Sequence, residues 1–593
     1  VGDDDLPDMA IGRLPVKSAI DADRLVDKII RYDSEAEVGA WQGKALLIAD
    51  DISNPDKPSD TEPYFVYDSE YMTNFFPEAM DIEKLYLGLF PLEGQGKPRA
   101  RDEFIRQFNE GALLVTYLGH GNPDVLAHEQ MFRVSRDLSE IKNGGRLPLF
   151  YTAASQVGVF DDPVKTSMPE ELLNLADGGV IGMISATRVG YHMSNVMLAE
   201  AFHDRMYRSG REGVPVGLAL MEAKPIALER LDVEDAVSVR NIRRYSLFGD
   251  PFQRMALPRY RVILNVQEPM QALGLVQIDG RVVDENGMLV TDYVGSVRIR
   301  AFDSSELSLL DGVRYRQVGA DLFRGLYSVN SGVFSAQFRV PKDITYGGNH
   351  GRVSAFAWDE EGRTAFGDIE NLGIAGTASN IEPDIEGPTI RISFEGNESF
   401  ESGDKVLGVP LLQVSIFDYS GINITGETGH EIELFLDNNE SIKLTDRFNV
   451  QGGDYREGVL EYSILGLEVG THVLALKAWD THNNSSRVEV NFEVVQSDEK
   501  FIQNALFYPN PLEGEMGYFT YTSEIDAEVS QIKIFTVDGN LIEVLDSGYS
   551  KGFNQVEWRK PANISNGTYI YKIELIGNNS VVAVHSGPLQ VAR

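Results

Sequence analysis

Cysteine is absent from all 593 residues of this chain. Disulfide bonds and thiolate metal sites are therefore excluded. Long apolar runs are also missing. The longest runs have the length of strands, as at 45–49 and 112–115, whereas a membrane-spanning helix needs about 18 apolar residues. We therefore expect no helix that crosses a membrane.

Basic residues are scarce. The chain has 53 lysines and arginines against 90 aspartates and glutamates, a formal net charge of -37. Such a charge repels phosphate backbones and anionic bilayers, so we expect no nucleic-acid partner. At about 150 residues per domain, the length predicts roughly four domains. The chain begins Val1-Gly-Asp-Asp-Asp5 without a starting methionine, and we interpret it as an N-terminally incomplete part of a longer protein.

The first 258 residues alternate apolar strands with segments of helical spacing. This pattern is typical of an α/β layer fold with mostly parallel strands. The spacing predicts buried strands at 46–50, 113–117, 147–151 and 180–184, and helices at 23–32, 101–109, 170–175 and 196–208.

From residue 259 onward the pattern changes to short alternating strands separated by Gly, Asn and Asp, with no convincing helix. Such a pattern is typical of successive β-sandwiches. We expect three all-β, immunoglobulin-like sandwich domains, at 259–380, 381–498 and 499–593.

Two strand ends carry side chains suited to catalysis. Gly119-His120-Gly121 follows the strand at 113–117, and Thr152-Ala-Ala-Ser155 ends the next one. The carboxyl ends of neighbouring parallel strands meet at one edge of a sheet, where α/β folds place their sites. A base and a nucleophile at these ends would form a dyad. A structural role for the Gly-His-Gly loop is an equal alternative.

The order of motifs resembles gingipain-type peptidases of family C25. Tyr117-Leu-Gly-His-Gly121 is followed by Thr152-Ala-Ala-Ser155, Gly158, Phe160-Asp161 and the closing Phe248-Gly-Asp-Pro251. The resemblance implies a caspase-like (gingipain-like) α/β catalytic domain over 1–258, with a histidine as general base and a cysteine as nucleophile. By position, His120 would be the base and Ser155 stands in the place of the cysteine. Backbone N–H groups near both, including that of Gly121, would form the oxyanion hole.

Serine at position 155 changes the expected chemistry. A thiol ionises readily beside a histidine, whereas a hydroxyl needs a closely placed base and an oxyanion hole suited to the shorter C–O bond. We therefore expect an inactive or very slow form. Either an engineered Cys→Ser change or a natural loss of the nucleophile accounts for Ser155.

Further polar residues have competing interpretations. Asp50, Asp51 and Glu70 are equal candidates for the carboxylate that orients the histidine. Arg188 either contacts substrate or, as we favour, forms a structural ion pair. His128-Glu129 lacks the second histidine of a zinc-protease motif, and we expect a surface pair. We predict no cofactor and no metal site.

The sandwiches carry motifs of a second kind. Asp418-Tyr-Ser-Gly-Ile-Asn423 and Lys477-Ala-Trp-Asp480 resemble PorU-type sortases of the type IX secretion system. Tyr508-Pro-Asn-Pro511 and the hairpin signal Val537-Asp-Gly539 resemble a type IX C-terminal signal domain.

This second resemblance implies a surface sortase of a Gram-negative, Bacteroidota-type bacterium, associated with the outer membrane. Its partners would be a PorV-like β-barrel shuttle, the C-terminal signal domains of secreted cargo, and surface lipopolysaccharide as acceptor. Two alternatives stay open. One is a pseudo-sortase that only binds cargo or shuttle, and the other is a secreted gingipain-like endopeptidase.

Overall fold

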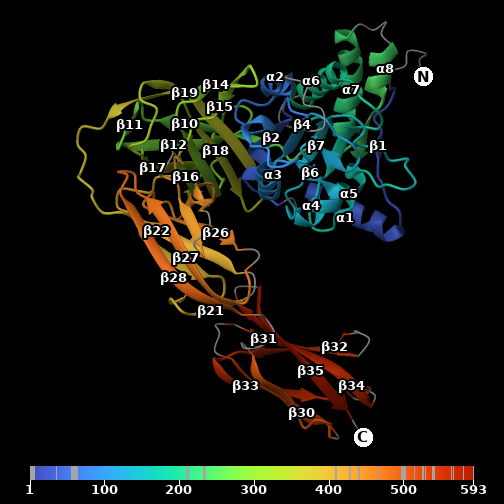
Figure 1. The fold of residues 1–593 in the computed structure, drawn as a ribbon, viewed down its shortest axis with the longest axis vertical. Coiled ribbons are helices and arrows are strands. Elements are labelled where there is room, and N and C mark those ends of the chain that lie inside the picture. The colour runs from blue at the N-terminus through green and yellow to red at the C-terminus, as the bar shows by residue number, and fades with distance from the viewer. Residues whose placement is uncertain are drawn as a thin grey trace. The chain divides into compact units, whose positions relative to one another are not determined.

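The computed structural model forms two compact units, Val1–Val340 with Ile344–Ser379, and Pro341–Asp343 with Asn380–Arg593. Figure 1 shows the ribbon, with the helices gathered in the N-terminal part of the first unit. The structure describes residues 7–34, 37–54, 64–208, 213–231, 236–397, 399–407, 410–426, 429–437, 441–464, 467–495, 502–512, 514–523, 527, 529–536, 541–561, 564, 566–577 and 580–591.

A seven-stranded sheet forms the centre of the N-terminal domain (Figure 1). Every neighbouring pair is parallel except β8 with β9. In sheet order the strands are β1 (Gly12–Arg13), β9 (Tyr245–Gly249), β8 (Gly182–Ala186), β7 (Leu149–Ala153), β4 (Leu114–Leu118), β2 (Lys44–Ala49) and β3 (Asp81–Tyr86). The mostly parallel α/β prediction is therefore confirmed, and the ends of β2, β4, β7 and β8 meet at one edge of the sheet.

Both faces of this sheet are covered. Alternating residues of β2 divide between two apolar cores, with Leu46 and Ile48 in one and Leu47 and Ala49 in the other. Near-continuous apolar strands are what burial on both faces requires. The first core is completed by α1 (Ala19–Ser34), α3 (Pro98–Glu110) and α5 (Met168–Asn174), and the second by α2 (Tyr64–Met72), α6 (His192–Arg208), α7 (Val216–Arg230) and α8 (Ala236–Arg243).

The first β-domain packs against the α/β domain within the same unit. Phe356 and Phe366 belong to the apolar core that also contains Tyr86 at the end of β3. In sheet order its strands are β17 (Val333–Arg339), β12 (Leu275–Val283), β10 (Tyr260–Val266), β19 (Thr364–Thr377), β18 (Gly348–Asp359), β13 (Gly295–Phe302) and β16 (Asp321–Val329). The hairpin β14 (Glu306–Leu310) and β15 (Val313–Gln317) accompanies them.

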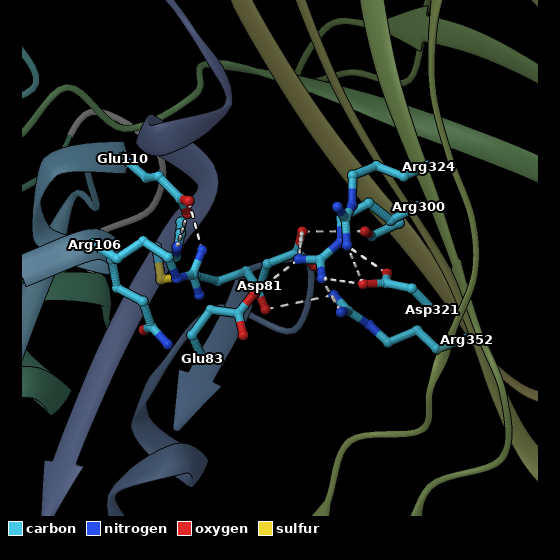
Figure 2. Close-up of polar contacts among 12 residues, drawn as sticks. Asp81, Glu83, Arg106, Glu110, Arg300, Asp321, Arg324 and Arg352 are labelled. Atoms are coloured by element: carbon cyan, nitrogen blue, oxygen red, sulfur yellow. Dashed lines mark hydrogen bonds and ion pairs between the residues drawn. The ribbon is translucent and has the colours of Figure 1, made fainter. Parts of the chain in front are cut away.

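Charged side chains meet where β3 faces this β-domain (Figure 2). Arg300 on β13 contacts Glu83 on β3 at 2.9 Å and Asp321 on β16 at 3.2 Å. Arg352 on β18 contacts Asp81, also on β3, at 2.7 Å. Burial opposes ionisation of Glu83, yet Arg300 and Lys44 hold the pKa of this carboxyl well below its usual range. The two domains therefore share a polar contact as well as an apolar core.

The second unit consists of β-sheets. One pairs β20 (Thr389–Phe394), β22 (Leu411–Phe417) and β26 (Glu457–Ser463), and another pairs β21 (Lys405–Leu407), β28 (Ser485–Val495), β27 (Gly470–Trp479) and β23 (Glu433–Leu436). A three-stranded sheet has the order β29 (Gln503–Tyr508), β30 (Met516–Ser523), β33 (Gly552–Arg559). A four-stranded sheet has the order β32 (Leu541–Gly548), β31 (Val529–Thr536), β34 (Gly567–Gly577), β35 (Ser580–Val591).

These sheets agree with the all-β class expected beyond residue 259. Among the described residues of that region the only helical segment is the short 3-10 turn Thr445–Arg447. Trp558 is fully buried in the core of the last domain against Phe507. The predicted hairpin turn at 537–539 lies outside the described residues. Within the part of the chain that the structure describes, none of the helices has the length and apolar character of a membrane span.

Candidate functional site

His120 and Ser155 lie at neighbouring strand ends. Leu118 of β4 pairs with Ala153 of β7, and each of the two residues follows its strand by two positions. Gly121 makes the close approach of the two loops possible, because a Cβ at this position would lie 2.7 Å from Cγ2 of Val157 and 3.3 Å from Cβ of Ala154. The sheet therefore brings the predicted base and nucleophile positions to one edge.

Asp50, at the end of the adjacent strand β2, is the carboxylate that contacts His120. Its Oδ2 accepts the backbone N–H of His120 at 2.9 Å and lies 3.2 Å from the imidazole Nδ1. The Tyr117 hydroxyl lies 3.3 Å from the same oxygen and donates to the carbonyl of His120 at 2.7 Å. When Nδ1 carries the proton and donates it to Asp50, Nε2 is left as the basic nitrogen.

The other two candidates for this role lie elsewhere. Asp51 forms an ion pair with Lys97 and accepts the N–H of Ser53. Glu70 accepts the Tyr86 hydroxyl and pairs with Lys84 at 2.6 Å. Of the three acidic residues, Asp50 alone has a described contact with the His120 ring.

Aromatic rings surround His120. Phe65 meets it edge-on, with ring centroids 5.4 Å apart, and the His128 ring lies 4.3 Å away. Phe65 also contacts His192, whose Nε2 lies 2.8 Å from Asp68. His128 was expected only in a surface pair, and Phe65 and Asp68 were not identified from the sequence. They carry no motif, and α2, which supplies Phe65 and Asp68, was not predicted.

Ser155 is held by the loop that follows β8. Its hydroxyl donates to the carbonyl of Gly190 at 3.0 Å and accepts the N–H of the same residue at 3.1 Å. The hydroxyl of Ser155 therefore acts both as a donor and as an acceptor toward the backbone of Gly190. The sharing of a proton between His120 and Ser155 stays a prediction.

Arg188, in the same loop, forms the ion pair that was favoured for it. Its guanidinium contacts both carboxylate oxygens of Asp161, at 3.0 and 2.5 Å. Hydrogen bonding to Asp161 raises the pKa of Arg188. Both side chains are about half exposed, so the pair contributes little to stability. A contact of Arg188 with substrate stays a prediction, as does a role of Gly121 in an oxyanion hole.

Glu129 is not part of a surface pair, so that prediction is wrong. The residue is 1% exposed. The chain after His120 folds back on itself, with the Ala127 N–H donating to the His120 carbonyl at 3.0 Å, and this reversal carries Glu129 inward. Its carboxylate lies near those of Asp50 and Asp51. Burial, followed by repulsion from both aspartates, raises the pKa of Glu129 to about 7.

Among solved structures, dimeric latent PorU from Porphyromonas gingivalis is 24% identical, with a TM-score of 0.29. That alignment covers 70% of this chain and 41% of the PorU chain, so this chain spans less than half of PorU. The Arg-specific cysteine proteinase gingipain R (RGPB) is 18% identical, with a TM-score of 0.37, over 63% of this chain and 77% of its own.

The complex of the pro- and mature domains of RgpB from Porphyromonas gingivalis also aligns, at 18% identity and a TM-score of 0.37, over 63% of this chain and 78% of that one. No curated protein matches the sequence. The sequence family described as Peptidase family C25 matches residues 1–256, which span the seven-stranded sheet and both strand ends described above. Residues 1–256 therefore carry the sequence pattern of peptidase family C25, over less than half of the length of this chain.

Proposed function

We propose that this protein is a type IX secretion sortase at the surface of a Gram-negative, Bacteroidota-type bacterium. It would cleave C-terminal signal domains from secreted cargo and join the new carboxyl end of the cargo to surface lipopolysaccharide. A PorV-like β-barrel of the outer membrane would be its docking partner. The peptidase family of residues 1–256 and the series of β-domains that follows support this proposal.

One observation carries the proposal. The imidazole of His120 is oriented by the buried carboxylate of Asp50, and Ser155 stands at the end of the neighbouring strand. A histidine whose Nδ1 is fixed by a carboxylate presents its other nitrogen as a base toward a nucleophile. The ring keeps 36% of its side-chain surface exposed, so a peptide can reach it.

The proposed reaction uses these residues in the following order. His120 takes the proton of the side chain at 155 as that side chain attacks the scissile carbonyl, and the amine of the departing signal domain receives this proton. The cargo is then joined to residue 155 through an ester or thioester. A nucleophile on the acceptor attacks this bond and gives its proton to His120, which passes the proton to the side chain of residue 155 as that side chain leaves.

With serine at 155 this sequence is slow. The hydroxyl must lose its hydrogen bonds with Gly190 before it attacks, and it is far less acidic than a thiol. The serine therefore favours a second candidate function, a catalytically dead pseudo-sortase that binds cargo or shuttle. A secreted gingipain-like endopeptidase is a third candidate.

Ser155→Cys in the complete protein tests the first two candidates. We expect this variant to release the signal domain from a purified cargo protein and, with an amine added as acceptor, to form an amide-linked product detected by intact mass spectrometry. Ser155→Ala and the double variant Ser155→Cys/His120→Ala are the controls. Intact cargo after incubation with Ser155→Cys would favour the pseudo-sortase. A mature cell-bound protein without residues 501–593 would favour the endopeptidase.

A further inference from the structure

Three acidic side chains lie together beneath His120. Asp50 and Asp51 follow β2, and Glu129 lies in the chain reversal after β4. They are 2%, 4% and 1% exposed. One carboxylate oxygen from each lies within 4.8 Å of the others. We call these residues the carboxylate cluster.

Hydrogen bonds account for only part of the cluster. Asp50 accepts N–H groups of Asp51 and His120, and Asp51 accepts that of Ser53. Both oxygens of Glu129 are buried and have no hydrogen-bond partner among the described residues. A carboxylate without partners is costly to bury unless a proton or a cation neutralises it. The burial of Glu129 therefore indicates that a proton or a cation neutralises its carboxylate.

The charges around the cluster do not balance. Lys97 is 5% exposed and pairs with Asp51, while its ammonium also donates to the carbonyl of Leu87 at 2.7 Å. One ammonium against three carboxylates leaves two negative charges in excess. Asp311, at the turn between β14 and β15, adds to the imbalance because it interacts electrostatically with Asp51, and its buried Oδ2 also lacks a described partner.

The donor atoms define the class of ligand. All donors are carboxylate oxygens, which hard divalent cations prefer. Calcium binds oxygens at about 2.3–2.6 Å, so three oxygens that lie within 4.8 Å of one another can share one calcium ion. Magnesium requires about 2.0–2.1 Å in a regular octahedron and usually keeps several waters, so buried protein carboxylates suit calcium better.

We propose that Asp50, Asp51 and Glu129 bind a divalent cation, and that this cation is calcium. The ion neutralises the two excess charges and ties the chain reversal after β4 to the end of β2. Since Asp50 contacts both the ion and His120, the ion also fixes the position of the imidazole. This inference stands on burial, charge and spacing, and it does not depend on the proposed function.

Terbium luminescence tests the site directly. Terbium binds calcium sites and emits when a nearby tyrosine is excited, and the hydroxyl of Tyr117 lies 3.3 Å from Asp50 Oδ2. We expect the full chain, freed of metal, to give tyrosine-sensitised terbium emission that calcium displaces. Glu129→Gln keeps the shape of the side chain and removes its charge, and at a fixed low terbium concentration it should lower the emission by at least on the order of tenfold.

Two control variants locate the signal. Glu78→Gln makes the same change at an exposed glutamate of the same domain and should retain the emission. Asp384→Asn alters the acidic group of Asp384, Asp480 and His482 in the second unit and should also retain it. Emission that survives in Glu129→Gln, or disappears in Asp384→Asn, would overturn the assignment.

Thermal unfolding adds an independent readout. Calcium should raise the melting temperature of the native chain and of Glu78→Gln, and should leave that of Glu129→Gln unchanged. If calcium leaves the melting temperature of the native chain unchanged, the carboxylate cluster does not bind the ion and the proposal is wrong. Neither readout uses peptidase activity, so failure here and failure of the sortase proposal can be told apart.

Discussion

Arg300→Met should weaken the contact between the α/β domain and the first β-domain. Arg300 is the cation through which β13 contacts both Glu83 of β3 and Asp321 of β16 (Figure 2). Methionine retains much of the apolar stem and removes the guanidinium. The variant therefore leaves Glu83 with Lys44 as its main cationic neighbour and Asp321 with Arg324.

The magnitude follows from the burial of the partners. Breaking a fully buried ion pair costs about 3–5 kcal/mol, because the remaining charge is left unpaired. The side chains of Arg300 and Asp321 are 15% and 12% exposed, but that of Glu83 is 31% exposed. Since water screens part of this interaction, we expect the lower value of about 2–3 kcal/mol. At about 2 °C per kcal/mol for a large unit, the transition of this unit falls by about 4–6 °C.

Differential scanning calorimetry on the full chain measures this shift. Arg314→Met, at an exposed position of β15, is the matched control and should melt with the native protein. The double variant Arg300→Met/Glu83→Gln should recover part of the loss, because it removes the stranded carboxylate. The pKa of Glu83 is lowered in the folded state, so its contribution is present above about pH 4.3 and is lost as the pH falls below that value. An Arg300→Met variant that melts with Arg314→Met would refute the reasoning.

Three further variants test the site and its support. In the Ser155→Cys protein, Asp50→Asn should lower the rate of cargo cleavage by on the order of 10³–10⁴-fold, and an unchanged rate would exclude Asp50 as the orienting group. Gly121→Ala should lower the melting temperature, because its Cβ would lie 2.7 Å from Val157, and a variant as stable as the native chain would contradict that close approach. His203, buried against Thr116, has a pKa lowered to about 3 by burial, so the folded state binds fewer protons than the unfolded state between about pH 6.5 and pH 3. Relative to His203→Gln, the native protein should lose up to about 1.4 kcal/mol per pH unit as the pH falls through this window in urea titrations, and parallel pH profiles would contradict it.

The sequence patterns did not predict those helices and strands whose apolar and polar residues do not alternate with a regular period. The β3 segment Asp-Ile-Glu-Lys-Leu-Tyr does not alternate as an exposed strand would, because its charges meet arginines of a domain more than 200 residues away. Helix α7 is apolar on several sides and contains Pro225, so no single apolar stripe marks it. Helix α2 is rich in aromatic residues without a clear polar face. Each of these patterns depends on packing partners that are remote in the sequence.

Some features were determined by the sequence alone. Apolar runs of strand length separated by helical spacing predict a sheet buried on both faces, because only such a sheet removes both faces of each strand from water. His120 and Ser155 were placed at one edge because each follows a buried parallel strand directly, and the direction of parallel strands leaves no other arrangement. The change to period-two patterns after residue 259 predicted β-domains for the same local reason.

Other features were decided only by tertiary structure. Asp50, Asp51 and Glu70 are equivalent as sequence, and the hydrogen bond from the backbone of His120 distinguishes Asp50 because β2 lies beside β4. Glu129 resembles a surface residue until the chain reversal after β4 buries it against two aspartates. Side-chain environment depends on which strands become neighbours, and that choice is made by the packing of the whole domain.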